Sequence, residues 1–143
     1  MSQDGVNSYL NKANHNQKLV AVLKDQGRDG FPDWVVIVMF YTGLHWLSAW
    51  LTRERCPKAG FSSHSATRST IHYSPRFKPD THIPVSKNAY NAYIELYDMS
   101  CTARYEGFLD EKAMKAFEME EIAQSEEALV ILKRFLEGKG MSL

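Results

Sequence analysis

The stretch Trp34–Leu51 has the sequence WVVIVMFYTGLHWLSAWL and contains no Asp, Glu, Lys or Arg. Such an apolar run is long enough for a buried core helix, and it reaches the lower limit for a helix that spans a membrane. Trp34 and Trp50 stand near its two ends, where membrane helices carry interfacial anchors. The stretch also holds one Thr, one His and one Ser, and the neighbouring amphipathic segments need an apolar partner. We therefore expect the central helix of a soluble bundle, with membrane insertion as the alternative.

The composition is that of one globular domain covering residues 1–143. Hydrophobic residues make up 44% of the chain and charged residues 24%, far from the composition of a disordered protein. The two cysteines are too few for a disulfide scaffold, and they form no CxxC pair. The N-terminal sequence MSQDGVNSYLNK lacks the basic start and apolar run of a signal peptide. We expect a cytoplasmic protein.

Glycine and proline residues divide the chain into four long predicted helices. These helices cover residues 6–26, 33–55, 86–106 and 110–138. Asp33, Ser86 and Asp110 are their predicted N-caps, and Gly107 closes the third helix. Four of the five prolines fall in the connection 56–85, so no long helix crosses it. This connection carries a predicted short helix at about 65–73, capped by Ser62 or Ser63. No strand hairpin is expected. The predicted fold is all-α, an antiparallel four-helix bundle with a long crossover.

Apolar residues recur at helical spacing in the last two long segments. The third predicted helix has a seam of small and apolar residues, Ala89, Ala92, Leu96, Met99 and Ala103. A second row lies beside this seam and consists of Tyr90, Tyr93, Tyr97 and Cys101. The fourth predicted helix has an apolar sector of Met119, Ile122, Leu129, Leu132 and Leu136. We expect these seams to face the core.

Charge is unevenly distributed in a chain whose 17 basic and 17 acidic residues cancel. From Arg55 to Lys78 there are five Lys or Arg residues and no Asp or Glu. Residues 106–137 contain nine acidic residues and four basic ones. The basic middle favours contact with phosphate or nucleic acid, although a solvated basic loop has the same composition.

Three residues of the basic middle form a candidate phosphate site. His64, Arg68 and His72 are spaced i, i+4 and i+8, so they share a face if the short helix includes all three. Arg offers a planar fork of donors, and His can give or accept a proton near neutral pH. Three histidines could also meet a zinc ion, but there is no HExxH motif or Cys/His box. We expect no metal and no cofactor.

Two residues outside the crossover have mainly structural interpretations. His45 lies in the apolar stretch, where a buried and hydrogen-bonded histidine is the commoner situation. Arg104 is near a helix C-terminus, where its charge complements the helix dipole. Cys101 has no base nearby in the sequence, so we do not expect a nucleophile there.

Three segments together resemble the HEPN superfamily, the small helical-bundle proteins of prokaryotic toxin–antitoxin, CRISPR and other defence systems. They are FYTGLHWLSAWL (Phe40–Leu51), SHSATR (Ser63–Arg68) and AYIELYDMSCTARY (Ala92–Tyr105). Their shared pattern is an aromatic pair before a helical His, a His/Arg element in the crossover, and a third helix that ends in Ala-Arg-Tyr. The resemblance spans about residues 33–107.

The resemblance implies a homodimeric four-helix bundle, and many members are metal-independent endoribonucleases that cut RNA in a groove at the dimer interface. Their usual signature is Arg, four to six residues, then His. Arg68 and His72 have only three residues between them, and Arg104 has no following His. A non-catalytic member that binds RNA or a protein partner therefore remains an alternative.

The leading hypothesis is a dimer that binds or cleaves RNA, in a toxin or defence setting. Arg68 would stabilise charge on the phosphate, while His72 or His64 would transfer a proton. Further RNA contacts are expected from Arg76, Lys78, Arg104 and Tyr105. The alternative is a non-catalytic helical module for dimerisation or for binding an antitoxin or another partner.

Overall fold

The computed structural model describes residues 2–25, 31–55, 63–74, 76, 82–105 and 111–143. Its long helices are α1 (Ser2–Lys24), α2 (Pro32–Arg55), α4 (Lys87–Tyr105) and α5 (Glu111–Gly138). The crossover contributes the short helix α3 (His64–Thr70) and two strands of two residues each, β1 (Ile71–His72) and β2 (Ile83–Pro84). The prediction of an all-α fold is confirmed.

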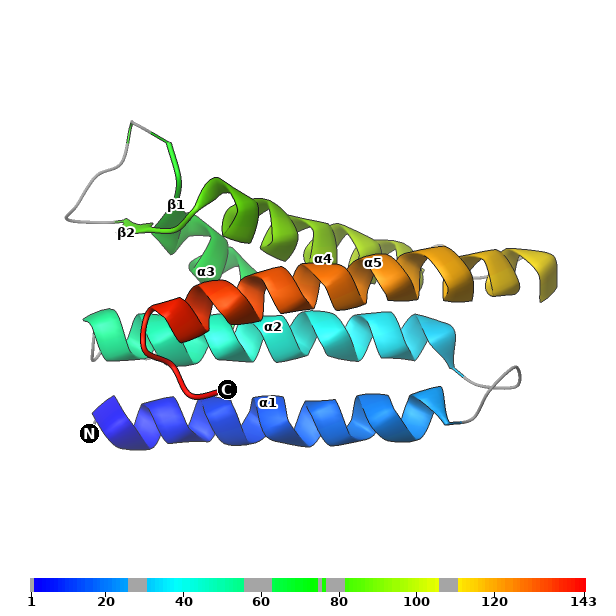
Figure 1. Cartoon of the computed structure of the whole chain (residues 1–143), viewed down its shortest axis with the longest axis horizontal. Helices are drawn as coiled ribbons and strands as arrows, with labels where there is room; N and C mark the ends of the chain where they lie inside the picture. Colours follow the sequence, from blue (N-terminus) through cyan, green and yellow to red (C-terminus); the bar gives the residue numbers. More distant parts are fainter. Residues whose placement is uncertain (1, 26–30, 56–62, 75, 77–81, 106–110) are drawn as a thin grey trace.

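Helix α2 is the centre of the arrangement, because α1, α4 and α5 all pack against it. Figure 1 shows the four long helices alternating in direction along the chain. Helices α4 and α5 also pack against each other. In its most apolar window, 83% of α2 is buried inside the protein. The helix is long and apolar enough to cross a membrane, yet the protein itself covers most of its surface.

The buried hydroxyl groups of α2 are satisfied within the helix. The Thr42 hydroxyl donates to the Val38 carbonyl at 2.9 Å, and the Ser48 hydroxyl donates to the Leu44 carbonyl at 2.7 Å. Both hydroxyls belong to fully buried side chains. A buried hydroxyl without a partner would be costly, so these bonds to the preceding turn let Thr and Ser lie in the core.

The helix starts agree with the predictions in one case and differ in another. Ser86 caps α4, because its hydroxyl accepts a hydrogen bond from the Ala89 amide at 3.1 Å. Asp33 is not a cap. Helix α2 begins one residue earlier, with Pro32 in the first turn and the Phe31 carbonyl accepting the Val35 amide at 3.0 Å. The predicted Asp110 cap and Gly107 lie outside the described residues.

The predicted seams are buried. All five residues of the α4 seam (Ala89, Ala92, Leu96, Met99 and Ala103) belong to the core. On α5, Leu132 and Leu136 are fully buried, while Ile122 and Leu129 pack against the core. The side chain of Met119 lies outside the described residues. The 3.6-residue period therefore located the core faces of both helices.

The end of α5 is fixed by a motif that lies just beyond the predicted end. The Met141 amide donates to the Leu136 carbonyl at 3.1 Å, and the Gly140 amide donates to the Glu137 carbonyl at 3.0 Å. These two bonds, with Gly140 at φ 91°, make a Schellman motif. The Arg53 guanidinium of α2 donates to the Lys139 carbonyl at 2.6 Å and so ties this end to the central helix.

The crossover departs most from the prediction. Ser63 caps α3 as predicted, but the helix ends at Thr70 and the chain becomes extended at Ile71. The Thr70 and Ser69 hydroxyls both donate to the Ala66 carbonyl. Such side-chain bonds compete with the backbone hydrogen bonds of a helix, so Ser and Thr are weak helix formers. Strand β1 then pairs in parallel with β2 in the register Ile71↔Ile83. His72 is consequently on a strand and not on the helix.

A candidate phosphate-binding site at α3 and α4

Helix α3 turns one face toward α4. His64, Thr67 and Arg68 are spaced i, i+3 and i+4, so they lie on one side of this short helix. Thr67 is fully buried and anchors that side, whereas Arg68 is exposed at its edge. The Ser63 cap fixes where the helix starts, since its hydroxyl accepts the Ala66 amide at 3.1 Å. Local capping therefore sets the direction in which His64 points.

His64 is held by two tyrosines of α4. Its Nδ1 lies 2.8 Å from the Tyr93 hydroxyl oxygen, a hydrogen-bond distance. Its ring stacks on Tyr97, with ring centroids 3.6 Å apart and an interplanar angle of 6°. The second ring nitrogen, Nε2, is buried and has no hydrogen-bond partner among the described residues. Nδ1 thus positions the ring, and Nε2 remains for proton transfer or for binding a ligand.

Phe40 of α2 is the floor beneath this pair of helices. It is 1% exposed, and its ring contacts those of His64, Tyr93 and Tyr97, with centroids between 5.5 and 5.9 Å apart. Two of these three contacts are edge-on, a favourable geometry for aromatic rings. The floor ties α3 to both α2 and α4.

Arg104 completes the site from the last turn of α4. Its guanidinium donates to the Tyr41 hydroxyl of α2 at 3.3 Å and to the Ser100 hydroxyl at 3.3 Å. Its Nε donates to the Ser100 carbonyl at 3.3 Å. These contacts hold the planar group over the α2–α4 boundary, so Arg104 does more than complement the helix dipole.

The electrostatics of the site act on His64. Burial lowers the pKa of His64, and the Arg68 and Arg104 cations lower it further, while Asp98 raises it. Both guanidinium groups therefore lie close enough to His64 to affect its charge. Burial also raises the pKa of the Tyr93 hydroxyl above its usual range. At neutral pH the site consists of a neutral imidazole and a protonated phenol between two cations.

The other predicted site residues lie elsewhere. His72 stacks on His82 with ring centroids 4.8 Å apart, and its Nδ1 accepts the Ser74 amide at 3.0 Å. The predicted face shared by His64, Arg68 and His72 is therefore wrong, because the helix ends before His72. Arg76 is exposed. Lys78 and the side chain of Tyr105 lie outside the described residues.

His45 also differs from the prediction. Its ring is only partly buried, and its Nδ1 has no hydrogen-bond partner in the described part of the chain. Burial lowers the pKa of His45, and Lys12 lowers it further. The expectation of a buried, hydrogen-bonded structural histidine is therefore wrong. The ring of His45 lies instead beside the rings of Tyr9 and Tyr41.

Helical spacing could have revealed the tyrosines as site residues. Tyr93, Tyr97, Ser100 and Arg104 recur at intervals of 4, 3 and 4 and so form a stripe on α4. The tyrosine row by itself predicts packing alone. The continuation of the stripe through Ser100 to Arg104 is the signal of a polar site. Across the described residues, no group of three or more His, Cys, Asp or Glu side chains could hold a metal ion.

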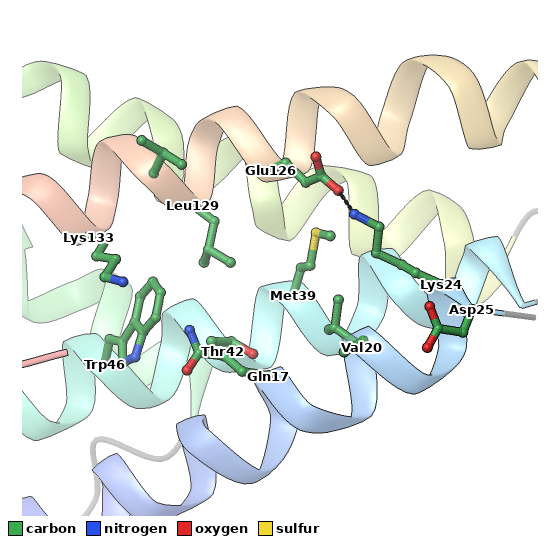
Figure 2. A pocket seen from close by; sticks show the side chains of 12 residues that line it. Gln17, Val20, Lys24, Asp25, Met39, Thr42, Trp46, Glu126, Leu129 and Lys133 are labelled. Carbon is green, nitrogen blue, oxygen red and sulfur yellow. Dashed lines mark hydrogen bonds and ion pairs between the residues drawn. The ribbon is translucent and has the colours of Figure 1, made fainter.

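A large hollow lies away from this site, between α1 and α5 (Figure 2). Its volume is about 590 Å³. Met39, Thr42 and Trp46 of α2 contribute to its lining, and an ion pair between Lys24 of α1 and Glu126 of α5 lies at one end. Because this groove is mostly apolar and contains none of the His64 cluster, it is a separate feature of the surface.

Comparison with known proteins gives no match. No protein-family model, no curated protein and no solved structure is significantly similar to this chain.

Proposed function

We propose that this protein binds single-stranded RNA through the α3–α4 site and acts as a HEPN-like ribonuclease or RNA-binding protein of a defence or toxin–antitoxin system. The observation that carries the proposal is the placement of two arginines around His64: Arg68 follows His64 by one turn of α3, and Arg104 continues the α4 stripe of Tyr93 and Tyr97, which hold the His64 ring. Two elements far apart in the sequence thus supply positive charge around one imidazole.

The charges suit a phosphodiester. Arg68 is exposed and forms no ion pair within the described residues, so its donors can reach a ligand. Arg104 is held in a fixed orientation by Tyr41 and Ser100. A guanidinium can bind two phosphate oxygens at once, so two arginines at one site favour a phosphate group as the ligand. Partly exposed Tyr41 and Tyr97 add ring faces on which bases could stack.

Cleavage would use His64 for proton transfer. In that reaction the ribose 2′-hydroxyl loses its proton and attacks phosphorus, the bond to the 5′-oxygen breaks, and that oxygen gains a proton. Neutral His64 could accept the first proton at Nε2, and the two arginines would stabilise the charged phosphorane. Because Nε2 is buried, substrate must shift neighbouring side chains to reach it.

The second proton transfer favours a homodimer. His72 is engaged with His82 and Ser74, so the described part of one chain supplies a single histidine at this site. A second copy of His64 across a symmetric interface would supply the missing acid. Helix α2 offers little apolar surface to a second copy, since α1, α4 and α5 cover it. Exposed Phe31 and Trp34, at 48% and 54%, are the apolar surface that a second copy could cover.

RNA binding at increasing salt tests the proposal. We expect Arg68→Ala and Arg104→Ala each to weaken binding of a ten-nucleotide oligouridylate and to lower the slope of log affinity against log salt by about 0.7. Arg134→Ala removes the same charge from an exposed position on α5 and should bind like wild type. His64→Gln should abolish cleavage in EDTA while retaining binding. Wild-type protein that binds no RNA at 50 mM salt would refute the proposal.

The groove in Figure 2 favours a second candidate, a helical partner-binding module. Lys133 lines this groove and has no ion pair among the described residues, so an amphipathic partner helix with an acidic residue would fit it. Val130, at 44% exposure, borders the same groove. Val130→Glu should leave RNA binding unchanged and prevent co-purification of an antitoxin encoded beside this protein. An equal loss of RNA binding in Val130→Glu would show that the groove is not separate from the RNA site.

A further inference from the structure

A second hollow lies between α1 and α2. Its volume is about 400 Å³, and α1 contributes five side chains at helical spacing to it. The sixth lining residue, His45, comes from α2. All six are polar, and none is a carboxylate; the α1 residues are Ser8, Asn11, Lys12, His15 and Asn16.

The chemistry of this hollow suits an anionic ligand with polar edges. Lys12 supplies a positive charge, and α1 has no Asp or Glu between residues 5 and 24. The two Asn amides and the Ser hydroxyl can both donate and accept hydrogen bonds. The Nδ1 atom of His45 is buried and has no hydrogen-bond partner in the described residues. A histidine that served packing alone would ordinarily have this nitrogen satisfied.

Side-chain contacts connect the hollow to the α3–α4 site. The ring of His45 lies 6.3 Å from that of Tyr9 and 6.4 Å from that of Tyr41, between centroids. The Tyr41 hydroxyl accepts a hydrogen bond from Arg104 at 3.3 Å. Lys12 lies over the Tyr9 ring at 5.6 Å from its centroid. The rings of Tyr9, His45 and Tyr41 therefore form a row from α1 across α2, with Lys12 beside its first ring and Arg104 beside its last.

We propose that the hollow around His45 is a second RNA subsite, which binds a phosphodiester and its nucleoside on the same strand that Arg68 and Arg104 bind. This inference rests on the proposed function and extends it by giving the RNA strand a path across α2. Lys12 contacts the phosphate, the Asn side chains contact base or ribose edges, and Tyr41 lies between the two subsites. Aromatic rings flanked by cations are a surface that suits single-stranded nucleic acid, because bases stack on the rings and phosphates pair with the cations.

The test compares charge removal inside and outside the hollow. Lys12→Ala removes a charge from the lining, and Lys18→Ala removes one from an exposed position of the same helix that does not line it. With a ten-nucleotide oligouridylate between 50 and 200 mM salt, Lys12→Ala should lower the salt slope by about 0.7, which is about a 2.6-fold change over that range. Lys18→Ala should match wild type. Asn11→Ala should weaken binding without changing the slope, because it removes hydrogen bonds and no charge.

The outcomes separate the two proposals. Loss of binding in Arg68→Ala together with identical slopes for Lys12→Ala and Lys18→Ala would overturn the second subsite and leave the α3–α4 site intact. Absence of wild-type binding would overturn both. A slope lowered in Lys12→Ala alone, with binding weakened in Asn11→Ala, would support the path across α2.

Discussion

Gly43 lies where α2 meets both α4 and α5, and its replacement by Ala tests how tightly these helices pack. A Cβ atom added at Gly43 would be 3.2 Å from a methyl carbon of Leu132 and 3.2 Å from one of Leu96. A methyl of Leu129 would be 3.5 Å away. Leu96 and Leu132 are at most 1% exposed, so neither has free space into which to move. The added methyl must therefore displace packed core atoms.

Two opposing effects set the size of the change. Ala is favoured over Gly inside a helix by about 1 kcal/mol. Adding a methyl to a well-packed core costs about 1–3 kcal/mol. We expect overpacking to win, so that Gly43→Ala lowers the free energy of unfolding by about 1 kcal/mol.

Gly138 is the matched control, because a Cβ there would have no atom within 4 Å. Gly138→Ala in α5 should be neutral or stabilising, up to about 1 kcal/mol. The difference between the two variants in urea unfolding then isolates the packing effect, at about 1–3 kcal/mol. If Gly43→Ala is as stable as Gly138→Ala, the close three-helix contact at Gly43 is not real.

Two further predictions concern the end of α5 and the effect of acid. Gly140→Ala should lower the free energy of unfolding by about 1 kcal/mol, because an L side chain is disfavoured at φ 91°; an unchanged urea midpoint would contradict the Schellman motif. Stability should fall as pH decreases below about 6.5, because burial lowers the pKa of His64 and His45 in the folded protein and the unfolded chain then binds more protons. His64→Gln should reduce this dependence between pH 7.5 and 5.5, and an identical pH profile would show that His64 does not contribute to it.

The long helices were predictable because strong local signals mark them. Ser86 caps α4 where expected, and Pro32 begins α2 one residue before the predicted start. The seams on α4 and α5 follow a period of 3.6 residues, which depends on sequence alone. The chain between these helices carries weaker signals. Thr70 and Ile71 are β-branched and end α3 early, so His72 leaves the face that helical spacing assigned to it.

The candidate site was only partly predictable for a related reason. Arg68 and Arg104 were identified as separate features, and only tertiary packing brings both to His64. Tyr93 and Tyr97 fit a packing seam equally well, because the sequence does not state which element will cover them. His45 was assigned to the core since its neighbours in sequence are apolar, but its side of α2 faces the hollow beside α1.

The pKa of His64, measured by NMR with and without RNA, tests the central claim most directly. In the free protein we expect a pKa below the ordinary value of about 6.5, owing to burial and to the two nearby arginines. A phosphate bound by Arg68 and Arg104 would bring negative charge beside the ring and raise that pKa. If the pKa of His64 is the same at saturating oligouridylate as in the free protein, the account is contradicted.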